Sequence, residues 1–466
     1  MNPTSSDVVR VQPRSAATAL PSPDFARRSL SGWGGWPKSV SDVVHPVDPT
    51  QLIGIQPSSA GYIPRGLGRS YGDAAQLGGG TVIEMTGLNE FSLDEGTGLL
   101  TAQAGTALGD ILATTVPRGW FLPVVPGTKH VTLGGAIAAD VHGKNHHRDG
   151  SFGSHVSWCE LVTSDRRVVS LASGTDEFEA TTGGMGLTGT ISRVTVRLAP
   201  IDSAWMTVDT ETAPDIVSVM ERLVDIDDEK RYSVAWLDLG AKRRGRGVVM
   251  GGDHARAEEL PERFKRRTAG KRGGGVSLPR ALPGVINETT VRAFNGLWYS
   301  RTPKRESGRI ESLDSFFFPL DRISGWNRLY GKRGFLQYQF VVPDDEPDTV
   351  VAIAERLARA GVPVALAVLK RMGPSAGGPL SFPMPGWTLA LDLPLGGTSL
   401  SSILDECDDD VARAGGKVYL AKDSRLRAGV AREMYRMLPA WREVRSSLDP
   451  HQRLRSNLSQ RLGLID

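Results

Sequence analysis

The chain has 466 residues, of which 40% are hydrophobic and 23% are charged, proportions that are typical of a soluble globular protein with two domains. Its net charge of +3 gives no reason to expect nucleic-acid binding, and no apolar run reaches the ~18 residues of a membrane-spanning helix. Two distant cysteines, Cys159 and Cys407, fit neither a zinc site nor a disulfide framework.

Residues 1–30 mix Ser, Pro, Thr and Arg without a continuous apolar segment. This composition predicts a flexible N-terminal tail and is not that of a secretory signal. Without a signal, the default location is the cytoplasm.

Residues 31–200 contain short apolar runs separated by glycine clusters, a pattern that predicts strands. Residues 106–116 have the apolar spacing of one short helix. This stretch is therefore expected to be a mixed α and β domain around a glycine-rich centre.

Residues 201–416 predict a second, α+β domain, because helical segments at 216–224 and 348–360 alternate with aromatic strands at 232–239 and 335–342. Within it, a basic stretch at about 254–280 predicts a mobile loop. That loop is either an ordinary solvated segment or a guide for an anionic substrate or lipid surface. Its charged residues are Arg263, Lys265, Arg266, Arg267, Lys271 and Arg272.

Three glycine-rich segments lie in the first domain: Arg65-Gly-Leu-Gly-Arg-Ser-Tyr-Gly-Asp73, a run from Pro126 to Asn145, and Gly183-Gly-Met-Gly-Leu-Thr-Gly189. Glycine lets a backbone turn tightly and bring its N–H groups against a phosphate. The first segment alone is weak evidence, since it matches neither a Walker loop nor a Rossmann fingerprint. Three such surfaces together suit a long ligand with a pyrophosphate and a planar ring.

These motifs resemble the vanillyl-alcohol-oxidase family of FAD-linked oxidoreductases, whose FAD-binding domain is of the PCMH type. Further motifs extend the resemblance over nearly the whole chain: Ser233-Val-Ala-Trp-Leu-Asp238, Gly334-Phe-Leu-Gln-Tyr-Gln-Phe340, Leu380-Ser-Phe-Pro-Met-Pro-Gly-Trp387 and Tyr419-Leu-Ala-Lys-Asp-Ser-Arg425. Within the family, the chain is most similar to the actinobacterial group that oxidises polyprenyl-phosphate-linked ribose. The resemblance implies an α+β fold with an FAD-binding domain at 31–200, a substrate domain on an antiparallel sheet at 201–416, and a segment at 417–466 that returns to the FAD domain.

The resemblance also implies which residues contact the flavin. They are Pro64, Arg65, Gly66, Leu67, Gly68, Arg69, Ser70, Tyr71, Gly72, Asp73, Ala74, Gly127, Thr132, Leu133, Gly134, Gly135, Ala139, Asp140, Val141, His142, Ile191 and Tyr419. Many relatives tether FAD through a histidine where this chain has Arg69, and arginine cannot form that link. The FAD is therefore expected to be bound non-covalently.

Lys422 matches the family's essential active-site lysine, and a cation there would stabilise the reduced flavin. The alternative is a surface salt bridge between Lys422 and Asp423. His142, Tyr71 and Lys144 are candidates for proton transfer or substrate orientation, and the sequence does not say which is the base.

Several residues are expected to bind substrate. Gln337 and Gln339 alternate with Tyr338 on a strand, so both amides face one side and can bind sugar hydroxyls, unless that side is an ordinary polar sheet face. Lys370 suits a phosphodiester, and Trp236 is either a pocket wall or a core residue. Lys144 is included with these residues.

The chain departs from its relatives at three positions. Thr388 and Ala390 stand where they usually have Asn and Cys, so covalent inhibitors that capture that cysteine should not attach here. Phe318 replaces a histidine and is expected to make the pocket rim more apolar. His146 and His147 raise the possibility of a metal, but no cysteine or carboxylate pair accompanies them, and no metal site is predicted.

The resemblance implies oxidation of the 2′-hydroxyl of decaprenylphosphoryl-β-D-ribose to a 2′-keto intermediate, the first half of an epimerisation that supplies arabinose for cell-wall arabinan. It also implies a keto-reductase partner of the short-chain dehydrogenase type, peripheral contact with a membrane, and the periplasmic face of the cell envelope. The alternatives are a flavin-dependent alditol or sugar-lactone oxidase and a flavin-binding or lipid-binding protein without turnover.

Overall fold

The computed structural model describes residues 23–240, 245–265, 276–277, 286–375, 377–396 and 399–465. Residues 1–22 of the expected N-terminal tail, and residues 266–275 and 278–280 of the expected basic loop, lie outside the described residues. Strand β1 (Phe25–Ser31) pairs with β2 (Lys38–Val44). The expectation of a flexible tail is therefore wrong for residues 25–30, because their backbone is hydrogen-bonded in a sheet.

The described part of the first region holds a four-stranded sheet, a five-stranded sheet and a two-stranded pair of β7 and β11. The four-stranded sheet has the order β1-β2-β4-β3, and β3 (Tyr62–Arg65) runs directly into the first glycine-rich segment. The five-stranded sheet has the order β5-β6-β10-β8-β9 and is antiparallel. The remaining bounds are β4 (Thr81–Glu84), β5 (Phe91–Asp94), β6 (Leu99–Gln103), β7 (Trp120–Phe121), β8 (Val156–Val162), β9 (Val168–Ala172), β10 (Thr190–Arg197) and β11 (Ala199–Pro200).

Short helices connect these strands. The helix expected at 106–116 is observed as α2 (Leu108–Thr115), which buries its apolar side against the five-stranded sheet region. α3 (Leu133–Ala138) lies within the second glycine-rich segment, where the Thr132 hydroxyl accepts a hydrogen bond from Gly135 N at 3.3 Å. The others are α1 (Gln51–Gly54), α4 (His146–Asp149) and α5 (Asp176–Thr181).

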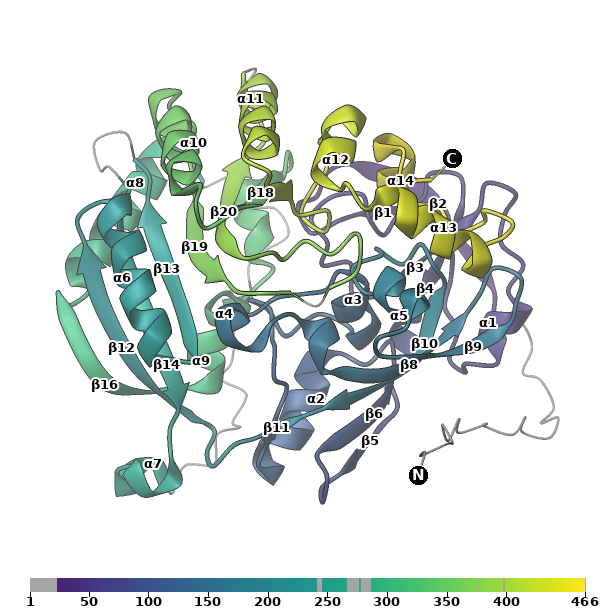
Figure 1. Ribbon diagram of the computed structural model, residues 1–466, viewed down its shortest axis with the longest axis horizontal. Helices are drawn as coiled ribbons and strands as arrows, with labels where there is room; N and C mark the ends of the chain where they lie inside the picture. The colour runs from purple at the N-terminus through teal and green to yellow at the C-terminus, as the bar shows by residue number, and fades with distance from the viewer. Residues whose placement is uncertain are drawn as a thin grey trace, which may run out of the picture.

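The second region is built on an eight-stranded sheet in the order β16-β12-β14-β13-β19-β20-β18-β21, with antiparallel neighbours throughout. The strands are β12 (Trp205–Ala213), β13 (Tyr232–Asp238), β14 (Arg246–His254), β16 (Arg305–Ser312), β18 (Phe335–Val342), β19 (Leu366–Met372), β20 (Gly386–Pro394) and β21 (Lys417–Val418). Figure 1 shows this sheet beside the first region, with helices along its outer side. The expectation of an α+β fold with an antiparallel sheet is confirmed.

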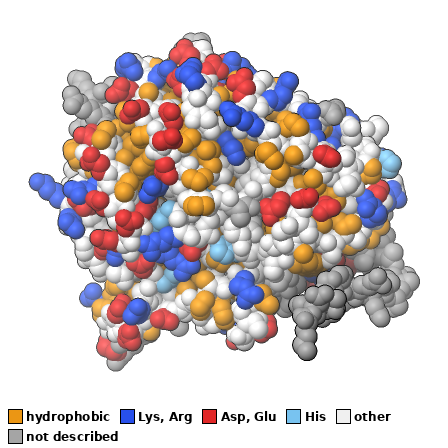
Figure 2. Space-filling model, in the orientation of Figure 1, with side chains coloured by type: hydrophobic (Ala, Val, Ile, Leu, Met, Phe, Trp, Pro, Cys, Tyr) orange, Lys and Arg blue, Asp and Glu red, His pale blue; other side chains and the backbone are white. Residues whose placement is uncertain are grey.

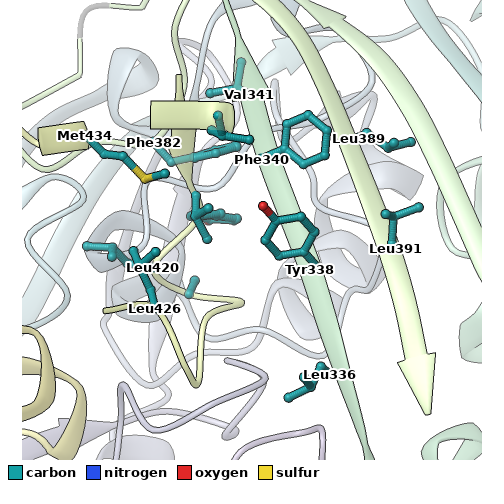
Figure 3. Close-up of a cluster of buried hydrophobic side chains, with 14 of the residues drawn as sticks. Leu336, Tyr338, Phe340, Val341, Phe382, Leu389, Leu391, Leu420, Leu426 and Met434 are labelled. Carbon is teal, nitrogen blue, oxygen red and sulfur yellow. The ribbon is translucent and has the colours of Figure 1, made fainter. Parts of the chain in front are cut away.

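Helices α6 (Ile216–Glu229), α10 (Pro347–Arg359) and α11 (Leu400–Arg413) cover one face of the sheet through their apolar sides. Alternation along β18 separates the two faces. Leu336, Tyr338 and Phe340 point into the core, where Leu420 and Leu426 lie beside them (Figure 3). The opposite face of β18 is not covered by these helices. The remaining elements of this region are α7 (Glu262–Lys265), α8 (Glu288–Arg301), α9 (Leu313–Phe317), β15 (Val276–Ser277) and β17 (Ile323–Ser324).

The C-terminal helices α12 (Ala428–Met434), α13 (Leu438–Leu448) and α14 (Asn457–Leu462) contact the first region. Tyr62 N donates to Arg453 O at 2.8 Å, and Arg461 pairs with Asp73 at 2.8 Å. Trp441 Nε1 donates to Ala180 O at 2.9 Å. The segment that follows β21 is thereby held against the glycine-rich side of the molecule.

Acidic and basic side chains are interspersed over the face shown in Figure 2, in keeping with the small net charge. Within the described ranges, no helix combines the length and the apolar character that crossing a membrane requires.

Candidate active site

A cavity of about 620 Å³ lies between the glycine-rich segments and the uncovered face of the eight-stranded sheet. Its size falls in the range of sites for cofactors and small molecules. One wall comes from residues 64–71, 125–144 and 185–191. The other comes from β13, β18, β19 and β20, and residues 419–422 close one end.

The first wall is made largely of backbone. A Cβ atom at Gly66 would lie 2.1 Å from Thr132 Oγ1, so no larger residue fits there. Gly68 has a φ of +64°, which favours glycine. A Cβ at Gly127 would meet no protein atom within 4 Å and would project into the cavity. This wall fits a ligand that is pressed against main-chain groups.

Two arginines of the first segment have different surroundings. Arg65 donates to Ser31 O at 2.7 Å and Ala75 O at 2.8 Å, so its guanidinium is committed to the protein. Arg69 stacks over the Trp33 ring at 3.9 Å, and its buried Nε has no hydrogen-bond partner in the described part of the chain. Burial lowers the pKa of Arg69. A buried guanidinium with a free donor fits an anionic ligand such as a pyrophosphate.

Most residues expected at the flavin site line this cavity. The exceptions are Gly72, Asp73, Leu133 and Asp140, which lie behind the wall. Leu133 is fully buried in the core, and Asp140 accepts from Gly153 N at 3.0 Å and from the Ser381 hydroxyl. These two side chains support the wall and cannot contact a ligand in the cavity.

Gly72 and Asp73 contact the C-terminal segment instead. A Cβ at Gly72 would lie 1.9 Å from Asp423 O, and the Asp73 carboxylate pairs with Arg461. Both residues therefore face the C-terminal segment, although Ala74, which follows them, lines the cavity again.

Two expectations for the substrate side are wrong. Thr388 lies on the cavity side of β20 but is buried and does not line the cavity, because its hydroxyl donates to Phe340 O at 2.8 Å and accepts from Gln339 Nε2 at 3.1 Å. Phe318 is only 2% exposed and packs in the core, so it does not form the pocket rim. Its neighbours Phe317 and Pro319 line the cavity instead.

Three lysines, Lys144, Lys370 and Lys422, face the cavity. Burial lowers the pKa of Lys370 and of Lys422 to about 7, and that of Lys144 to about 8. The positive charges of Lys144 and Lys422 further lower the pKa of Lys370. None of the three forms a salt bridge among the described residues, so together they offer charge to an anionic ligand.

Lys422 Nζ lies 3.9 Å from the centre of the Tyr71 ring. The alternative salt bridge with Asp423 is not observed, because the Asp423 carboxylate pairs with Arg461 at 2.9 Å and accepts from Arg425 N and Leu426 N. The buried carboxylate of Asp392 raises the pKa of Lys422 and partly offsets the effect of burial. Tyr71 and Lys422 thus meet at one end of the cavity.

His142 is held at both ring nitrogens. Lys370 Nζ lies 2.9 Å from Nδ1, and the Gln339 amide nitrogen lies 2.9 Å from Nε2. Burial and the Lys370 charge lower the pKa of His142 well below its usual value. The ring is therefore neutral.

Gln337 and Gln339 both line the cavity. Gln337 Nε2 donates to Asp392 Oδ1 at 2.6 Å, which leaves the Gln337 carbonyl oxygen to accept from a ligand hydroxyl. Burial raises the pKa of Asp392 to about 6. The role of Asp392 was not predicted from the sequence. The residue pattern of a strand does not identify a buried carboxylate that orients an amide.

Trp236 and Ala390 also line the cavity, beside Val368 of β19. Tyr419 lines it too, and its hydroxyl donates to Ala139 O at 2.7 Å. Sequence reasoning missed several lining residues, because aromatic and aliphatic side chains at these positions look like ordinary core residues. They include Trp33, Trp326, Leu366, Val368, Phe294 and Trp298, and the carboxylate of Asp321 lines the cavity as well.

His146 and His147 do not join this site as ligands. His146 is buried with both ring nitrogens unpartnered in the described chain, and burial lowers its pKa to about 3. His147 Nδ1 lies 3.7 Å from Asp227 Oδ1. The described residues contain no cluster of three or more His, Cys, Asp or Glu side chains that could hold a metal ion.

The backbone wall, the free Arg69 donor and the adjoining α+β sheet together define the class of FAD-linked oxidoreductases. Residues 57–172 match the family model described as an FAD binding domain. A solved structure of a BBE-like 1 protein from Physcomitrella patens shares the fold, with a TM-score of 0.64 and 14% identity over 91% of this chain and 92% of that one.

Comparison with individual relatives shows more closely where the chain belongs within this class. The chain is 37% identical to the decaprenylphosphoryl-β-D-ribose oxidase of Mycolicibacterium smegmatis over 94% of this chain and 98% of that protein. It is 38% identical to an uncharacterised Streptomyces coelicolor protein from the mprA 5′ region, over 75% of this chain and 97% of that protein. An alditol oxidase of Streptomyces sp. is 24% identical over 37% of this chain and 42% of its own length. The chain belongs to the family of FAD-dependent oxidoreductases that includes the Mycolicibacterium smegmatis oxidase.

Proposed function

We propose that the protein oxidises the 2′-hydroxyl of a polyprenyl-phosphate-linked ribose, such as decaprenylphosphoryl-β-D-ribose, to the 2′-ketone. The observation that carries this proposal is the cluster of Lys144, Lys370 and Lys422 in one cavity beside the amides of Gln337 and Gln339. The lysines suit a phosphodiester, and the amides suit sugar hydroxyls. The name of the Mycolicibacterium smegmatis relative supports the same substrate.

FAD would be held by the backbone wall, with Gly66, Gly68 and Gly127 allowing close approach and Arg69 facing its phosphates. Bound FAD supplies the acceptor for the hydride that leaves the sugar carbon. Attachment is non-covalent in this proposal. Arg69 cannot form a flavin link, and His142, the histidine of the described cavity lining, already has both ring nitrogens engaged.

Lys422 accepts the hydroxyl proton. With a pKa of about 7, it is unprotonated in a substantial fraction of molecules near neutral pH. Taking the proton from the sugar oxygen turns Nζ into a cation at the moment when the hydride delivers negative charge into the same buried cavity. His142 is a poorer candidate, because Lys370 Nζ and the Gln339 amide nitrogen already lie within hydrogen-bond distance of its two ring nitrogens.

The sheet face beside this site becomes less polar along the strands. Lys370, Val368 and Leu366 follow one another along the cavity side of β19, and Trp236 lies opposite Val368. A phosphate bound by Lys370 would leave a prenyl chain on the apolar side chains beyond it. A soluble alditol has no group for this strip, which is the reason for preferring the lipid-linked sugar.

Epimerisation needs a second protein in this proposal. Oxidation removes two electrons from C2 of the ribose, so a ketone must be reduced again from the other face to give the arabinose configuration. A keto-reductase of the short-chain dehydrogenase type is the partner we propose.

Anaerobic flavin bleaching tests the proposal. The purified protein should show flavin absorbance that acid precipitation releases into solution, and farnesylphosphoryl-β-D-ribose should bleach it. Bleaching by xylitol or a sugar lactone, with none by the phosphoribose, would replace the proposal by an alditol or lactone oxidase. A protein that neither contains nor takes up FAD would refute it altogether.

A further inference from the structure

Helix α8 exposes its apolar side chains and buries a polar one. Phe294, Leu297 and Trp298 are 61%, 49% and 47% exposed, and their spacing places them on one face of the helix. Asn295 is the buried residue of the helix, at 3% exposure. A helix that packs on a soluble domain normally shows the reverse arrangement. The apolar face of α8 therefore has no counterpart among the described residues that buries it.

Polar contacts fix α8 on the sheet. Asn295 Nδ2 donates to Asp238 Oδ1 at 3.4 Å, and the Tyr299 hydroxyl donates to Ala213 O at 3.3 Å. The Arg246 guanidinium stacks on the Tyr299 ring at 4.2 Å. These contacts set the rotation of the helix about its axis, so the exposure of the apolar face follows from the way in which the helix is anchored.

The exposed face is continuous with the cavity. Phe294 and Trp298 line it while remaining about half exposed, so they stand at its mouth. Leu366 lies at the same end, because the β13–β19 register places it near Asp238, the anchor of α8. The apolar strip of the sheet thus leads from Lys370 to the outer face of α8.

Exposed basic residues lie at and just after the C-terminal end of α8. Arg301 lies seven residues after Phe294 and so on the same side of α8, and Lys304 and Arg305 follow it. All three are exposed, and none forms a salt bridge within the part of the chain that the structure describes. Aromatic side chains flanked by arginine and lysine are the composition that anchors proteins at the interface of anionic membranes.

We propose that α8 docks on an anionic lipid bilayer and buries Phe294, Leu297 and Trp298 at its interface. Docking opens the cavity mouth toward the lipid, and a prenyl chain passes from the bilayer along α8 to Leu366 and Val368. The direction of this path rests on the function proposed above, whereas the docking surface rests on the exposure and charge of α8. The two can therefore fail separately.

Vesicle flotation tests the surface without any substrate. The FAD-loaded protein should float with vesicles of equal parts phosphatidylglycerol and phosphatidylcholine, and much less with phosphatidylcholine alone. Replacing Phe294, Leu297 and Trp298 together by Ser should lower binding at least about tenfold. The matched control replaces three equally exposed apolar residues elsewhere, Val47, Val168 and Val217, by Ser and should bind like the unchanged protein. Equal binding by both triple variants would overturn the proposal.

A fluorescent label locates the contact. Cys159 and Cys407 are fully buried, so a thiol-reactive, polarity-sensitive dye will label Leu297→Cys or, as a control, Val168→Cys. Adding anionic vesicles should shift the emission of the dye at residue 297 to shorter wavelength and leave the dye at residue 168 unchanged. A shift at neither position, or at both equally, contradicts docking through α8. Loss of a dimer in the Ser variant by sedimentation velocity, without any vesicle binding by the unchanged protein, would assign the face to a second copy instead.

The bleaching assay separates the two proposals. Vesicle binding through α8 with no bleaching by farnesylphosphoryl-β-D-ribose would leave the docking surface and refute the substrate. Bleaching in solution with no shift at residue 297 would leave the oxidation and refute the docking surface.

Discussion

The two walls of the cavity are built from different parts of the chain. The wall at residues 64–71 and 125–144 consists mainly of backbone, and at Gly66 there is no room for a Cβ atom. The wall on the eight-stranded sheet consists of side chains such as Gln337, Gln339 and Lys370. These side chains project from regular strands, whose backbone is hydrogen-bonded within the sheet. A substitution in the first wall alters the path of the main chain. A substitution in the second wall alters only the side chains that project from the sheet into the cavity.

Two departures from the family pattern lie on the sheet, whereas Arg69 lies in the backbone wall. Ala390 belongs to the sheet wall, and Thr388 lies on the same face beside it, buried and hydrogen-bonded to Gln339. The sheet tolerates such replacements without altering the glycine-rich wall. We therefore expect variation in the sheet wall to change substrate handling and leave FAD binding unaffected.

The largest effect is expected at the end where the walls meet. Lys422→Met should lower kcat by about a thousandfold, because it removes both the proton acceptor and the cation, while FAD stays bound. Stopped-flow bleaching and flavin absorbance measure the two properties. Lys332→Met, at an exposed lysine outside the cavity, should behave like the unchanged protein. A Lys422→Met rate within tenfold of normal would remove this residue from the mechanism.

Damage to the backbone wall should affect the cofactor. Gly127→Val places side-chain atoms in the cavity and should weaken FAD binding by about a hundredfold, which corresponds to about 2.7 kcal/mol. Titration of the apoprotein with FAD measures it. Gly429→Val is the matched control, since a Cβ there also meets no atom within 4 Å but lies on helix α12 outside the cavity. Equal FAD affinity in the two variants would contradict a flavin on this wall.

Damage to the sheet wall should spare the cofactor. Lys370→Met should raise the KM for farnesylphosphoryl-β-D-ribose by about tenfold to a hundredfold through loss of a charged contact, with unchanged FAD affinity. Arg371→Met removes the same charge from the next residue, which faces away from the cavity, and should leave KM nearly unchanged. A KM effect of equal size at both positions would show that general charge, and not Lys370, attracts the substrate.

The pH dependence separates the roles of two lysines. Because the neutral form of Lys422 is the proton acceptor in the proposed mechanism, kcat should rise about tenfold per pH unit below about 7 and level off above it. KM should increase above about pH 7, where Lys370 loses its charge. Steady-state rates between pH 5.5 and pH 9, all roughly within the stable range of a typical protein, give both curves. A kcat that falls as pH rises through 7 would contradict proton transfer to Lys422.

The smallest effect is expected for Ala390→Cys. This change adds a small side chain to the sheet wall beside Val368 and should alter kcat by less than about twofold. It should also make the enzyme sensitive to iodoacetamide, to which the unchanged protein is resistant because both of its thiols are buried. Inactivation of the unchanged protein at the same rate would place a reactive thiol elsewhere.

The sequence predicted the backbone wall better than the sheet wall. Glycine spacing identified Gly66, Gly68 and Gly127, because few residues satisfy that geometry. Alternation around Tyr338 identified Gln337 and Gln339 for a similar reason, since a strand has only two faces. Motif matching also carried over Asp140 and Leu133, which lie behind the wall, because a motif records neighbours in sequence and not the direction of each side chain.

Residues brought together by the fold could not be predicted in this way. Asp392 orients Gln337 from the next strand, and the pairing register that joins them is invisible in either segment alone. The α8 residues Phe294 and Trp298 have the spacing of any amphipathic helix, and only their exposure distinguishes them. The resemblance predicts Phe318 at the rim of the pocket from its position in the sequence alone. In the structure its ring packs in the hydrophobic core.

The position of oxidation tests the central claim most directly. The FAD-loaded protein is incubated with farnesylphosphoryl-β-D-ribose in air, and the product is reduced with sodium borodeuteride and released by mild acid. We expect ribose and arabinose that carry deuterium at C2. Deuterium at another carbon, or pentose without deuterium, would contradict it.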